Sequence, residues 1–548
     1  MRRPLPAMFL CVSILLMALA RAGGAQELRG TVTDSVSGVP IAGAVLTLFD
    51  ASGAMLRRQL SDQRGEYRIA TDSNVRRMHV VRIGFRPRDI VVPRGTSGDT
   101  RLNVQMVSIP TLLEPVHVLA AANCPRRSDR ARAAALMDQA RAGLVTTVVA
   151  RETKPARMVR LRFIRRMEGN GDRIESQEVR IDASDQVAAS FKAVRTATDF
   201  VTLGFRRDSA GTQEFFGPDA DVLLDDGFMQ GYCFQISDRD RDRPNQIGLA
   251  FVPADHRKGR IDIEGALWID TVARELRDLE FRYVGLDTRY DRMRAGGRIS
   301  FRAMENGVVM IDRWFFRLLG AASDSIFGRN SRTLRTIYYV RESGGEVAHA
   351  SWPDGTEWQA ALGTLRGLAL DRAGKPVPGA ILRLTDTDYG VTTDGRGAFE
   401  ISNLLPGPYH GEIVDSALAP LGITISAPVA FRAERDSTVR LTFTVPTALE
   451  FVHRACDELP ELTKPVDERS AWMLGRVVDD KGAPVKGVTV MINDGIKTGS
   501  NGLFYFCKGL AIGTTARIVT RRGDEPERAT LVPIKQPLTV LTIVLPPP

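Results

Sequence analysis

A sequence block that occurs three times constrains the fold of this chain more than any other feature. In its first copy, Gly30-Thr-Val-Thr-Asp34 is followed by Gly38-Val-Pro-Ile41 and then by Gly43-Ala-Val-Leu-Thr-Leu48. The second copy begins at Gly367 and the third at Gly475, with the same order of residue types. Repetition of one unit of strands and turns predicts repeated domains of one fold.

Each residue type in the block has a local conformational role. Asp bonds its own backbone in turns, Gly supplies a positive φ, and Pro fixes φ while donating no hydrogen bond. After the second Gly the residues alternate, which predicts a strand with one buried face. The inward positions are Ala44, Leu46 and Leu48, then Ala380, Leu382 and Leu384, and finally Val488, Val490 and Ile492. The positions between them, including Thr47, Arg383 and Thr489, are expected to face solvent.

A second signal follows each copy at a similar offset. It reads Ser61-Asp-Gln-Arg-Gly65-Glu-Tyr67, then Thr393-Asp-Gly-Arg-Gly397-Ala-Phe399, then Thr498-Gly-Ser-Asn-Gly502-Leu-Phe504. We interpret it as a hairpin turn that ends in Gly and leads into an inward-facing aromatic residue. These segments resemble the carboxypeptidase regulatory-like domain, a transthyretin-like β-sandwich related to carbohydrate-binding-like folds. The resemblance implies a fold and little about function, because such modules accompany many unrelated proteins.

The patterns together predict a mainly β chain. We expect three transthyretin-like β-sandwich modules and a central α+β domain with a curved antiparallel sheet and one N-terminal helix. The predicted sandwiches span residues 26–108, 362–447 and 471–548, and the central domain spans 124–350. Between them, 349–363 is expected to be a linker and 450–469 a connector.

Within the central region, hairpins are predicted where alternating runs flank turn residues. One joins residues 260–270 to 275–284, and another joins 298–304 to 308–318 across Glu305-Asn-Gly307. Asn-Gly between alternating runs is a strong hairpin signal. The phrase Gly265-Ala-Leu-Trp-Ile-Asp270 is similar to strands of lipoprotein-carrier-like half-barrels. That resemblance implies a concave sheet that holds an apolar ligand.

The first residues predict export. Arg2 and Arg3 precede an apolar run, so residues 1–25 read as a signal peptide cleaved near Ala22 or Ala25. We therefore expect the periplasm or the cell surface of a bacterium. No later run reaches the roughly 18 apolar residues of a transmembrane segment. The net charge of +9 comes from 74 basic and 65 acidic residues without a basic stripe, which argues against nucleic-acid binding. The oligomeric state stays open.

Motifs for catalysis or metal binding are missing from the sequence. The six histidines show none of the spacings of a zinc hydrolase. The acidic pairs Asp219/Asp221 and Asp225/Asp226 do not match a calcium loop. There is also no serine-hydrolase elbow and no phosphate-binding loop. We therefore predict no metal, no cofactor and no enzymatic activity.

Four cysteines remain after signal cleavage, and an even number in an exported protein permits disulfides. Four cysteines allow three pairings. Domain organisation favours Cys124–Cys233, within the central domain, and Cys456–Cys507, between the connector and the third sandwich. Buried free thiols are the alternative, since sequence does not show geometry.

Tryptophans are the candidate ligand-binding residues, because flat rings stack on sugars. Trp268 and Trp314 lie on predicted strands of the central domain. Alternation places Trp268 on the face opposite Ile261 and Ile263. If that face is open to solvent, Trp268 is a candidate for binding ligand, and if the sheet is covered on both sides it belongs to the core. Trp352 and Trp358, in or beside the linker, are expected to be more exposed.

The sequence thus predicts a non-catalytic binding or structural protein of the bacterial cell envelope, with a glycan or an envelope protein as partner. One alternative is an accessory component of an outer-membrane, TonB-type transport system. Another is an enzyme with its site in residues 124–350. In each case the unrepeated segment Cys124–His349 is where we expect the specific activity.

Overall fold

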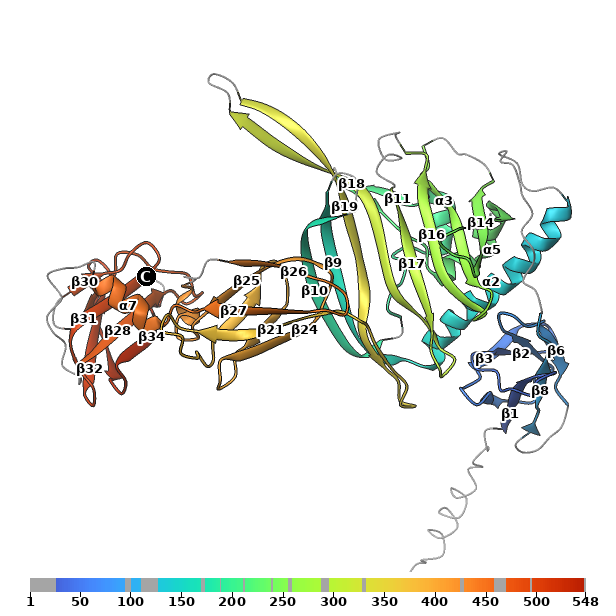
Figure 1. Cartoon of the computed structure of the whole chain (residues 1–548), viewed down its shortest axis with the longest axis horizontal. Helices are drawn as coiled ribbons and strands as arrows, with labels where there is room; N and C mark the ends of the chain where they lie inside the picture. Colours follow the sequence, from blue (N-terminus) through green and yellow to red (C-terminus); the bar gives the residue numbers. More distant parts are fainter. Residues whose placement is uncertain are drawn as a thin grey trace, which may run out of the picture. The chain divides into compact units, whose positions relative to one another are not determined.

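The structure is a computed structural model that describes residues 26–546, except 94–99, 110–126, 169–172, 188, 210–211, 238–239, 255–258, 287–294, 328–331, 424–427, 458–469 and 493–494. The predicted signal peptide lies outside the described residues. The described chain is mainly β, as predicted, with several separate sheets and few helices (Figure 1).

By its contacts the chain divides into two units. The first unit holds Met1–Arg162, Gly169–Gly171 and Asp182–Gln359. The second holds Phe163–Glu168, Asp172–Ile181 and Ala360–Pro548.

The first sandwich consists of two sheets. One has the order β4-β1-β7, with β8 also paired to β1, and the other has the order β3-β2-β5-β6. Leu28, Val32, Leu46 and Leu48 fill the space between the sheets and are 0% exposed. The strands are β1 Gln26–Asp34, β2 Val45–Phe49, β3 Met55–Leu60, β4 Glu66–Thr71, β5 Arg77–Val81, β6 Arg88–Val91, β7 Thr100–Arg101 and β8 Val104–Met106.

The second and third sandwiches repeat this topology. Their sheets have the orders β24-β21-β27 and β23-β22-β25-β26, then β31-β28-β34 and β30-β29-β32-β33. The predicted inward residues are buried, apart from the half-buried Ile492. The strands are β21 Gly363–Leu370, β22 Ile381–Leu384, β23 Gly390–Thr392, β24 Ala398–Leu404, β25 Gly407–Val414, β26 Val429–Ala433 and β27 Thr438–Thr444, then β28 Ser470–Val478, β29 Thr489–Met491, β30 Gly495–Lys497, β31 Leu503–Ala511, β32 Thr515–Arg521, β33 Arg528–Pro533 and β34 Leu538–Val544.

The second sequence signal forms the predicted turn in every copy. Gly65, Gly397 and Gly502 have φ of 69–71°, a conformation that favours glycine. The first residue of each signal has a hydroxyl side chain, and this hydroxyl makes two hydrogen bonds. Ser61 Oγ accepts from the Ala44 amide at 2.9 Å and donates to the Ile41 carbonyl at 2.7 Å. Thr393 and Thr498 make the same two bonds in their sandwiches, so this buried hydroxyl ties the turn to the inward strand.

The outer face of β2 differs from the expectation of a wet face. Thr47 is 9% exposed and Val45 is 0% exposed. Helix α2, Arg127–Thr153, packs against β2 and β3 and covers this face. The prediction was wrong here because alternation indicates two faces but not what a distant helix covers.

The central sheet has the order β10-β9-β19-β18-β17-β16-β15-β14-β13, with β20 paired to β19. Both predicted hairpins are confirmed, β15 with β16 and β17 with β18. The strands are β9 Ala156–Met167, β10 Ile174–Val187, β13 Tyr232–Ile236, β14 Gln246–Pro253, β15 Asp262–Asp270, β16 Glu275–Val284, β17 Gly296–Ala303, β18 Val309–Phe327, β19 Arg332–Ser351 and β20 Glu357–Gln359; β11 Arg206–Ser209 and β12 Thr212–Phe215 form a separate pair.

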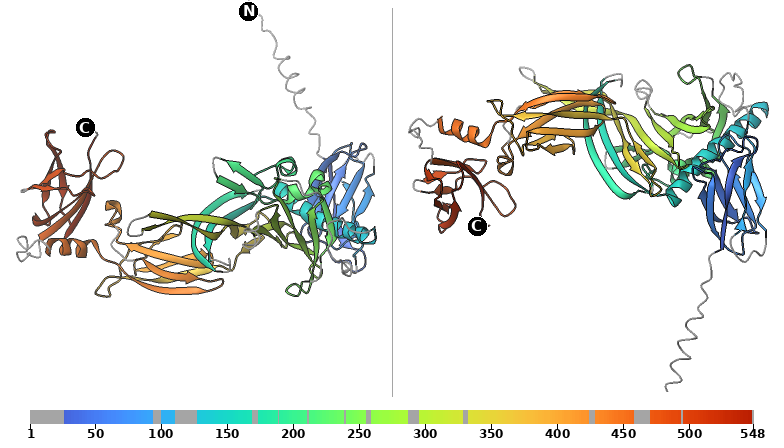
Figure 2. Two further views of the ribbon diagram at one scale, coloured as in Figure 1. Left: turned by 90° about the horizontal axis from the view of Figure 1, so that it is seen from above. Right: turned by 60° about the horizontal axis from the view of Figure 1, so that its bottom comes forward.

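Helices cover one face of this sheet (Figure 1; Figure 2). Besides α2, three short helices that the sequence prediction missed lie here: α3 Ala197–Leu203, α4 Ala220–Leu224 and α5 Asp226–Gln230. Each begins at a side-chain cap, provided by Thr196, Asp219 and Asp225. Helices this short carry too little periodicity to be recognised, although their caps are visible in the sequence.

The expected linker at 349–363 contains the boundary between the two units, after Gln359, and also parts of β19, β20 and β21. Residues Trp352–Thr356 form the turn between β19 and β20, closed by the Trp352 amide and the Thr356 carbonyl at 2.9 Å. Trp352 is 5% exposed in a core cluster, so its expected exposure was wrong. Trp358 is half-buried beneath the guanidinium of Arg302, 4.0 Å from the ring centroid.

In the first unit the first sandwich packs closely on the central domain. Ile83 is 2% exposed and belongs to the central core cluster. The Gly84 amide donates to Gln139 Oε1 of α2 at 2.7 Å, and Arg82 donates to the Arg274 carbonyl at 3.0 Å. A buried side chain and specific polar bonds thus fix one domain against the other.

In the second unit the second sandwich pairs with the tip of the β9–β10 hairpin. Val179 is 0% exposed and exchanges backbone hydrogen bonds with Asp386 and Asp388, at 3.2 and 3.0 Å. Arg165 donates to the Gln177 amide oxygen at 3.1 Å and to the Pro406 carbonyl at 3.3 Å. A strand of the hairpin therefore docks on the sandwich through main-chain bonds.

Candidate functional site

The two tryptophans proposed to bind ligand are buried on opposite faces of the central sheet. Trp314 is 7% exposed, and its ring lies 5.5 Å from that of Phe191 in the main core cluster. Trp268 is also 7% exposed, with the guanidinium of Arg243 4.5 Å from its ring centroid. Neither ring offers an open face for stacking on a sugar, and both positions fit the core alternative.

The helix side of the central sheet is filled with large side chains. Phe200, Phe228, Phe251 and Tyr283 are at most 2% exposed and pack between the sheet and α3–α5. A hollow beside α2, lined in part by Ser190 and Trp352, has a volume of only about 40 Å³. That is close to the volume of a single water molecule. The described side chains thus occupy the place where the half-barrel resemblance implied an apolar ligand.

The acidic pairs of the central region have structural roles. Asp219 accepts from the Val222 amide at 3.0 Å and Asp225 from the Gly227 amide at 2.9 Å, so they cap α4 and α5. Asp221 forms two bonds with Arg151, at 2.7 and 3.0 Å. Among the described residues no group of His, Cys, Asp and Glu side chains is placed to hold a metal ion.

The other face of the central sheet carries cross-strand ion pairs. Arg298 binds both oxygens of Asp278, at 2.9 and 2.8 Å, and Ser300 donates to the same carboxylate at 2.7 Å. Burial raises the pKa of Asp278, but the bonds from Arg298 and Ser300 outweigh it and leave the pKa below its usual value. Asp312 differs, because burial outweighs the attraction of Arg302 and raises its pKa. Within each pair the positive charge of the arginine and the negative charge of the aspartate neutralise each other across neighbouring strands.

A larger hollow lies on the third sandwich, and we call it the α7 groove. Its volume of about 620 Å³ is in the range of ligand sites. Helix α7, Ala448–Asp457, forms one wall, and strands β30 and β31 with the turn between them form the other. The groove is lined by Phe451, Arg454, Ala455, Leu474, Ile496, Lys497, Gly499, Asn501, Leu503, Phe504 and Tyr505.

Helix α7 forms because its first turn is capped and one face is apolar. Glu450 donates its amide to Thr447 Oγ1 at 3.2 Å, and its carboxylate accepts from the Thr447 amide at 3.0 Å, which is a capping box. Val452 and Cys456, on the same face, are 0% and 6% exposed in a cluster with Leu474 of β28. The helix is thereby held against the outer face of the sheet that contains β28 and β31.

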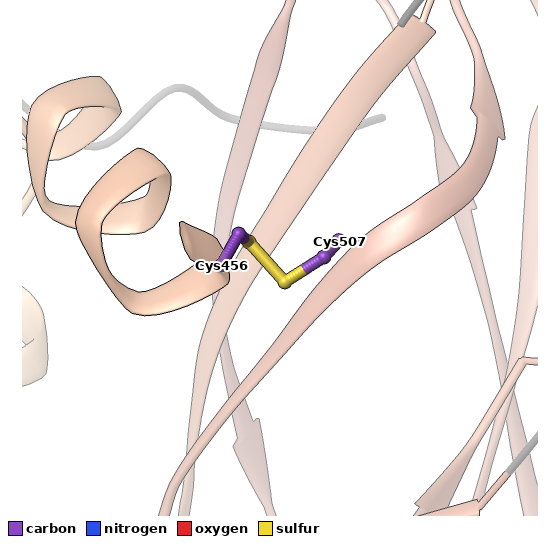
Figure 3. Close-up of a disulfide and its surroundings, with 2 residues drawn as sticks. All are labelled: Cys456 and Cys507. Atoms are coloured by element: carbon purple, nitrogen blue, oxygen red, sulfur yellow. A yellow bond between two sulfur atoms is a disulfide. The ribbon is translucent and has the colours of Figure 1, made fainter. Parts of the chain in front are cut away.

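A disulfide joins the end of α7 to β31 (Figure 3). The Sγ atoms of Cys456 and Cys507 are 2.07 Å apart and the Cα atoms 5.7 Å apart. This is one of the two pairs that domain organisation favours. For the other pair, Cys233 lies buried in β13, but Cys124 lies outside the described residues, so that pairing stays a prediction. The disulfide stands at the groove wall, next to Ala455 and two residues from Tyr505.

The α7 groove combines an apolar floor with a cationic rim. Phe451, Ile496 and Tyr505 are half-buried, whereas Arg454 and Lys497 are exposed. None of the lining residues that the structure describes is acidic. Within the described part of the chain, neither Arg454 nor Lys497 forms an ion pair. An occupant with apolar groups and negative charge would complement this surface.

The sequence interpretation did not find this groove. It placed the activity between Cys124 and His349, and it treated 450–469 as a connector. A signal was present, since Thr447-Ala-Leu-Glu450 before an apolar run is the pattern of a capping box. The strands that complete the groove are separated from α7 by the gap at 458–469, so their approach depends on tertiary packing.

Comparison with known families identifies the first sandwich. Residues 27–107 match the family model of the carboxypeptidase regulatory-like domain. The first sandwich belongs to this family. The shared strand order of the three sandwiches shows that the second and third repeat the topology of this regulatory-like domain. A search of curated proteins found no match for the chain.

Solved structures give only distant likenesses. The TIE protein of Bacillus anthracis is 13% identical over 62% of this chain and 63% of its own, with a TM-score of 0.16. BcpA, the major pilin subunit of Bacillus cereus, is 11% identical over 76% and 98%, with a TM-score of 0.14. A streptococcal ancillary pilin is 11% identical over 45% and 80%, with a TM-score of 0.16. At these TM-scores the likenesses carry no argument about this chain.

Proposed function

We propose that this chain is a non-catalytic binding protein of the bacterial cell envelope that holds a glycan or protein partner in the α7 groove. The observation that carries the proposal is the groove itself, about 620 Å³ in volume, with an apolar floor and a cationic rim. The regulatory-like domain of residues 27–107 agrees with a modular, accessory role.

The disulfide beside the groove also supports the proposal. The Cys456–Cys507 disulfide fits an oxidising compartment and ties both walls of the groove together. No described helix has the length and apolarity to cross a membrane. The central domain acts in this proposal as a rigid support, because large side chains fill its helix-covered face.

A blocking substitution tests the groove directly. Lys497→Trp places a large ring in the groove, whereas Lys481→Trp changes an exposed lysine of the same sandwich outside it. Residues 26–548 of each variant, immobilised on a sensor surface, are presented with envelope polysaccharides and with purified envelope proteins. We expect at least one partner to bind the parent and the Lys481→Trp variant and to lose affinity for Lys497→Trp. Equal binding by all three chains would contradict the proposal.

A further inference from the structure

The α7 groove runs along the edges of two strands. Leu503, Phe504 and Tyr505 are consecutive in β31, and all three line the groove. Successive side chains of a strand point to opposite faces, so three consecutive residues can line one hollow where it borders the edge of the strand. Ile496 and Lys497 of β30 line it in the same way.

Both strands stand at the ends of their sheets. In the described topology β31 is terminal in β31-β28-β34, and β30 is terminal in β30-β29-β32-β33. On its inner side β31 pairs with β28, with Phe504 opposite Gly475 and Tyr505 opposite Leu474. A terminal strand presents backbone N–H and C=O groups that an extended chain can pair with. Those of Leu503 are already bonded, its amide to Asn501 Oδ1 and its carbonyl to the Gly499 amide, both at 3.2 Å, so pairing with β31 begins at Tyr505.

From this geometry we infer that the groove receives an extended protein segment with acidic side chains, which adds as a strand to the outer edge of β31. This inference rests on the proposed function and names the class of its partner. Main-chain bonds to the edge supply affinity, while apolar side chains on one face of the segment contact Phe451, Ile496 and Tyr505. Its acidic side chains approach Arg454 and Lys497.

The lining favours a protein segment over a glycan. Among its described residues the lining holds no carboxylate that could accept hydrogen bonds from sugar hydroxyls. Phe504 is 1% exposed, and its ring packs against that of Phe506 inside the sandwich instead of facing outward. The groove presents a strand edge and positively charged side chains. An acidic peptide in an extended conformation can bind to both.

Fluorescence anisotropy with defined peptides tests the inference on residues 26–548. The probe is a labelled peptide of alternating glutamate and valine, about as long as the nine residues of β31. The same peptide with lysine in place of glutamate is the charge control. We expect the acidic peptide to bind more tightly by at least about tenfold, with binding weakened by salt.

Two matched sets of changes locate the site and the pairing. Lys497→Glu should weaken binding of the acidic peptide about tenfold. Lys535→Glu makes an equal charge change at an exposed site away from the groove and should leave that binding unchanged. N-methylation of single peptide amides should abolish binding at every second position only, since alternate amides of an added strand face the edge. Equal effects of the two variants, or no N-methyl pattern, would overturn the inference.

The outcomes separate this inference from the proposed function. If a polysaccharide binds in a Lys497→Trp-sensitive way and the acidic peptide does not bind, strand addition is wrong and the binding function stands. If no partner responds to Lys497→Trp, both are wrong. Cross-linking of a photoreactive group at position 497 to the chain's own residues 458–469 in the presence of peptide would also overturn the inference.

Discussion

Gly43 of the first sandwich and Gly307 of the β17–β18 turn meet backbone to backbone. A Cβ atom added to Gly43 would lie 2.7 Å from the Gly307 carbonyl oxygen, and both residues have positive φ, 68° and 81°. Beside them Lys154 donates to the Asn306 carbonyl at 2.8 Å. The contact is part of the junction that holds the first sandwich on the central domain.

We expect Gly307→Ala to destabilise this junction. The added methyl group would meet the backbone of Gly43 and Ser61, which cannot move like the end of a side chain. Gly53→Ala is the matched control, because Gly53 has φ 84° with nothing within 4 Å. Urea unfolding should show Gly307→Ala less stable than Gly53→Ala by about 1–3 kcal/mol. Equal losses would show that only backbone strain matters at Gly307.

The Cys456–Cys507 disulfide should hold α7 in place. It closes a loop with a sequence separation of 51 residues, and disulfides of this kind contribute about 2–4 kcal/mol. We expect Cys456→Ala/Cys507→Ala to lower the free energy of unfolding by that amount and to speed hydrogen exchange in 448–457. Dithiothreitol should raise exchange in α7 of the parent but not of the double variant. Unchanged exchange in α7 would contradict the prediction.

Asp278 should contribute stability at neutral pH that is lost in acid. Its pKa in the folded chain lies below the unfolded value of about 3.9, so the contribution is present above that pH and disappears as pH falls through the folded pKa. We expect Asp278→Asn to cost about 1–3 kcal/mol at pH 7, a figure moderated by the partial exposure of Arg298. Chemical denaturation across pH should show the difference from the parent shrinking below about pH 4.

Asp312, on the same sheet, should affect the pH dependence of stability in the opposite direction. Its folded pKa is raised, chiefly by burial, so its charged form costs stability above the folded pKa and nothing well below the unfolded one. Asp312→Asn should therefore be at least as stable as the parent at pH 7 and equal to it near pH 3. A loss at pH 7 as large as that of Asp278→Asn would contradict this assignment.

The docking of the second sandwich on the β9–β10 hairpin should depend on the backbone of Val179. Val179→Pro removes the amide that donates to the Asp386 carbonyl at 3.2 Å and leaves that carbonyl without this partner. We expect a loss of about 1–3 kcal/mol and faster proteolysis in 386–388. Arg180→Ala, which removes the exposed pair with Asp388, should cost less than about 1 kcal/mol. If Val179→Pro and Arg180→Ala reduced stability by similar amounts, the side-chain ion pair and not the backbone bond would hold the contact.

Much of the fold could be read from the sequence because its signals are local. Gly65, Gly397 and Gly502 mark turns that need positive φ, and Ala44, Ala380 and Val488 directly precede strands whose alternation indicates the buried face. The helices α3–α5 were missed because they are short, and the exposure of Thr47 and Trp352 was misjudged because distant elements cover them. The two errors in exposure share one cause, since contacts between remote segments leave no local pattern.

The candidate site was harder to predict than the fold. Trp268 and Trp314 were predicted as candidates for ligand binding because of their residue type, yet both are buried in the structure. The α7 groove instead joins Arg454 to Lys497, whose neighbours in the sequence give no sign that they share a surface. Only the capping box at Thr447 pointed to a helix there.

By itself the sequence determined the repeated sandwiches, their turns and their inward strands, because turn chemistry and strand alternation act over a few residues. The tertiary structure alone decided that the helix-covered face of the central sheet is filled, that α7 lies over β28 and β31, and that two strand edges border one groove. Those features depend on packing between segments far apart in the chain, where burial of apolar surface determines which faces meet.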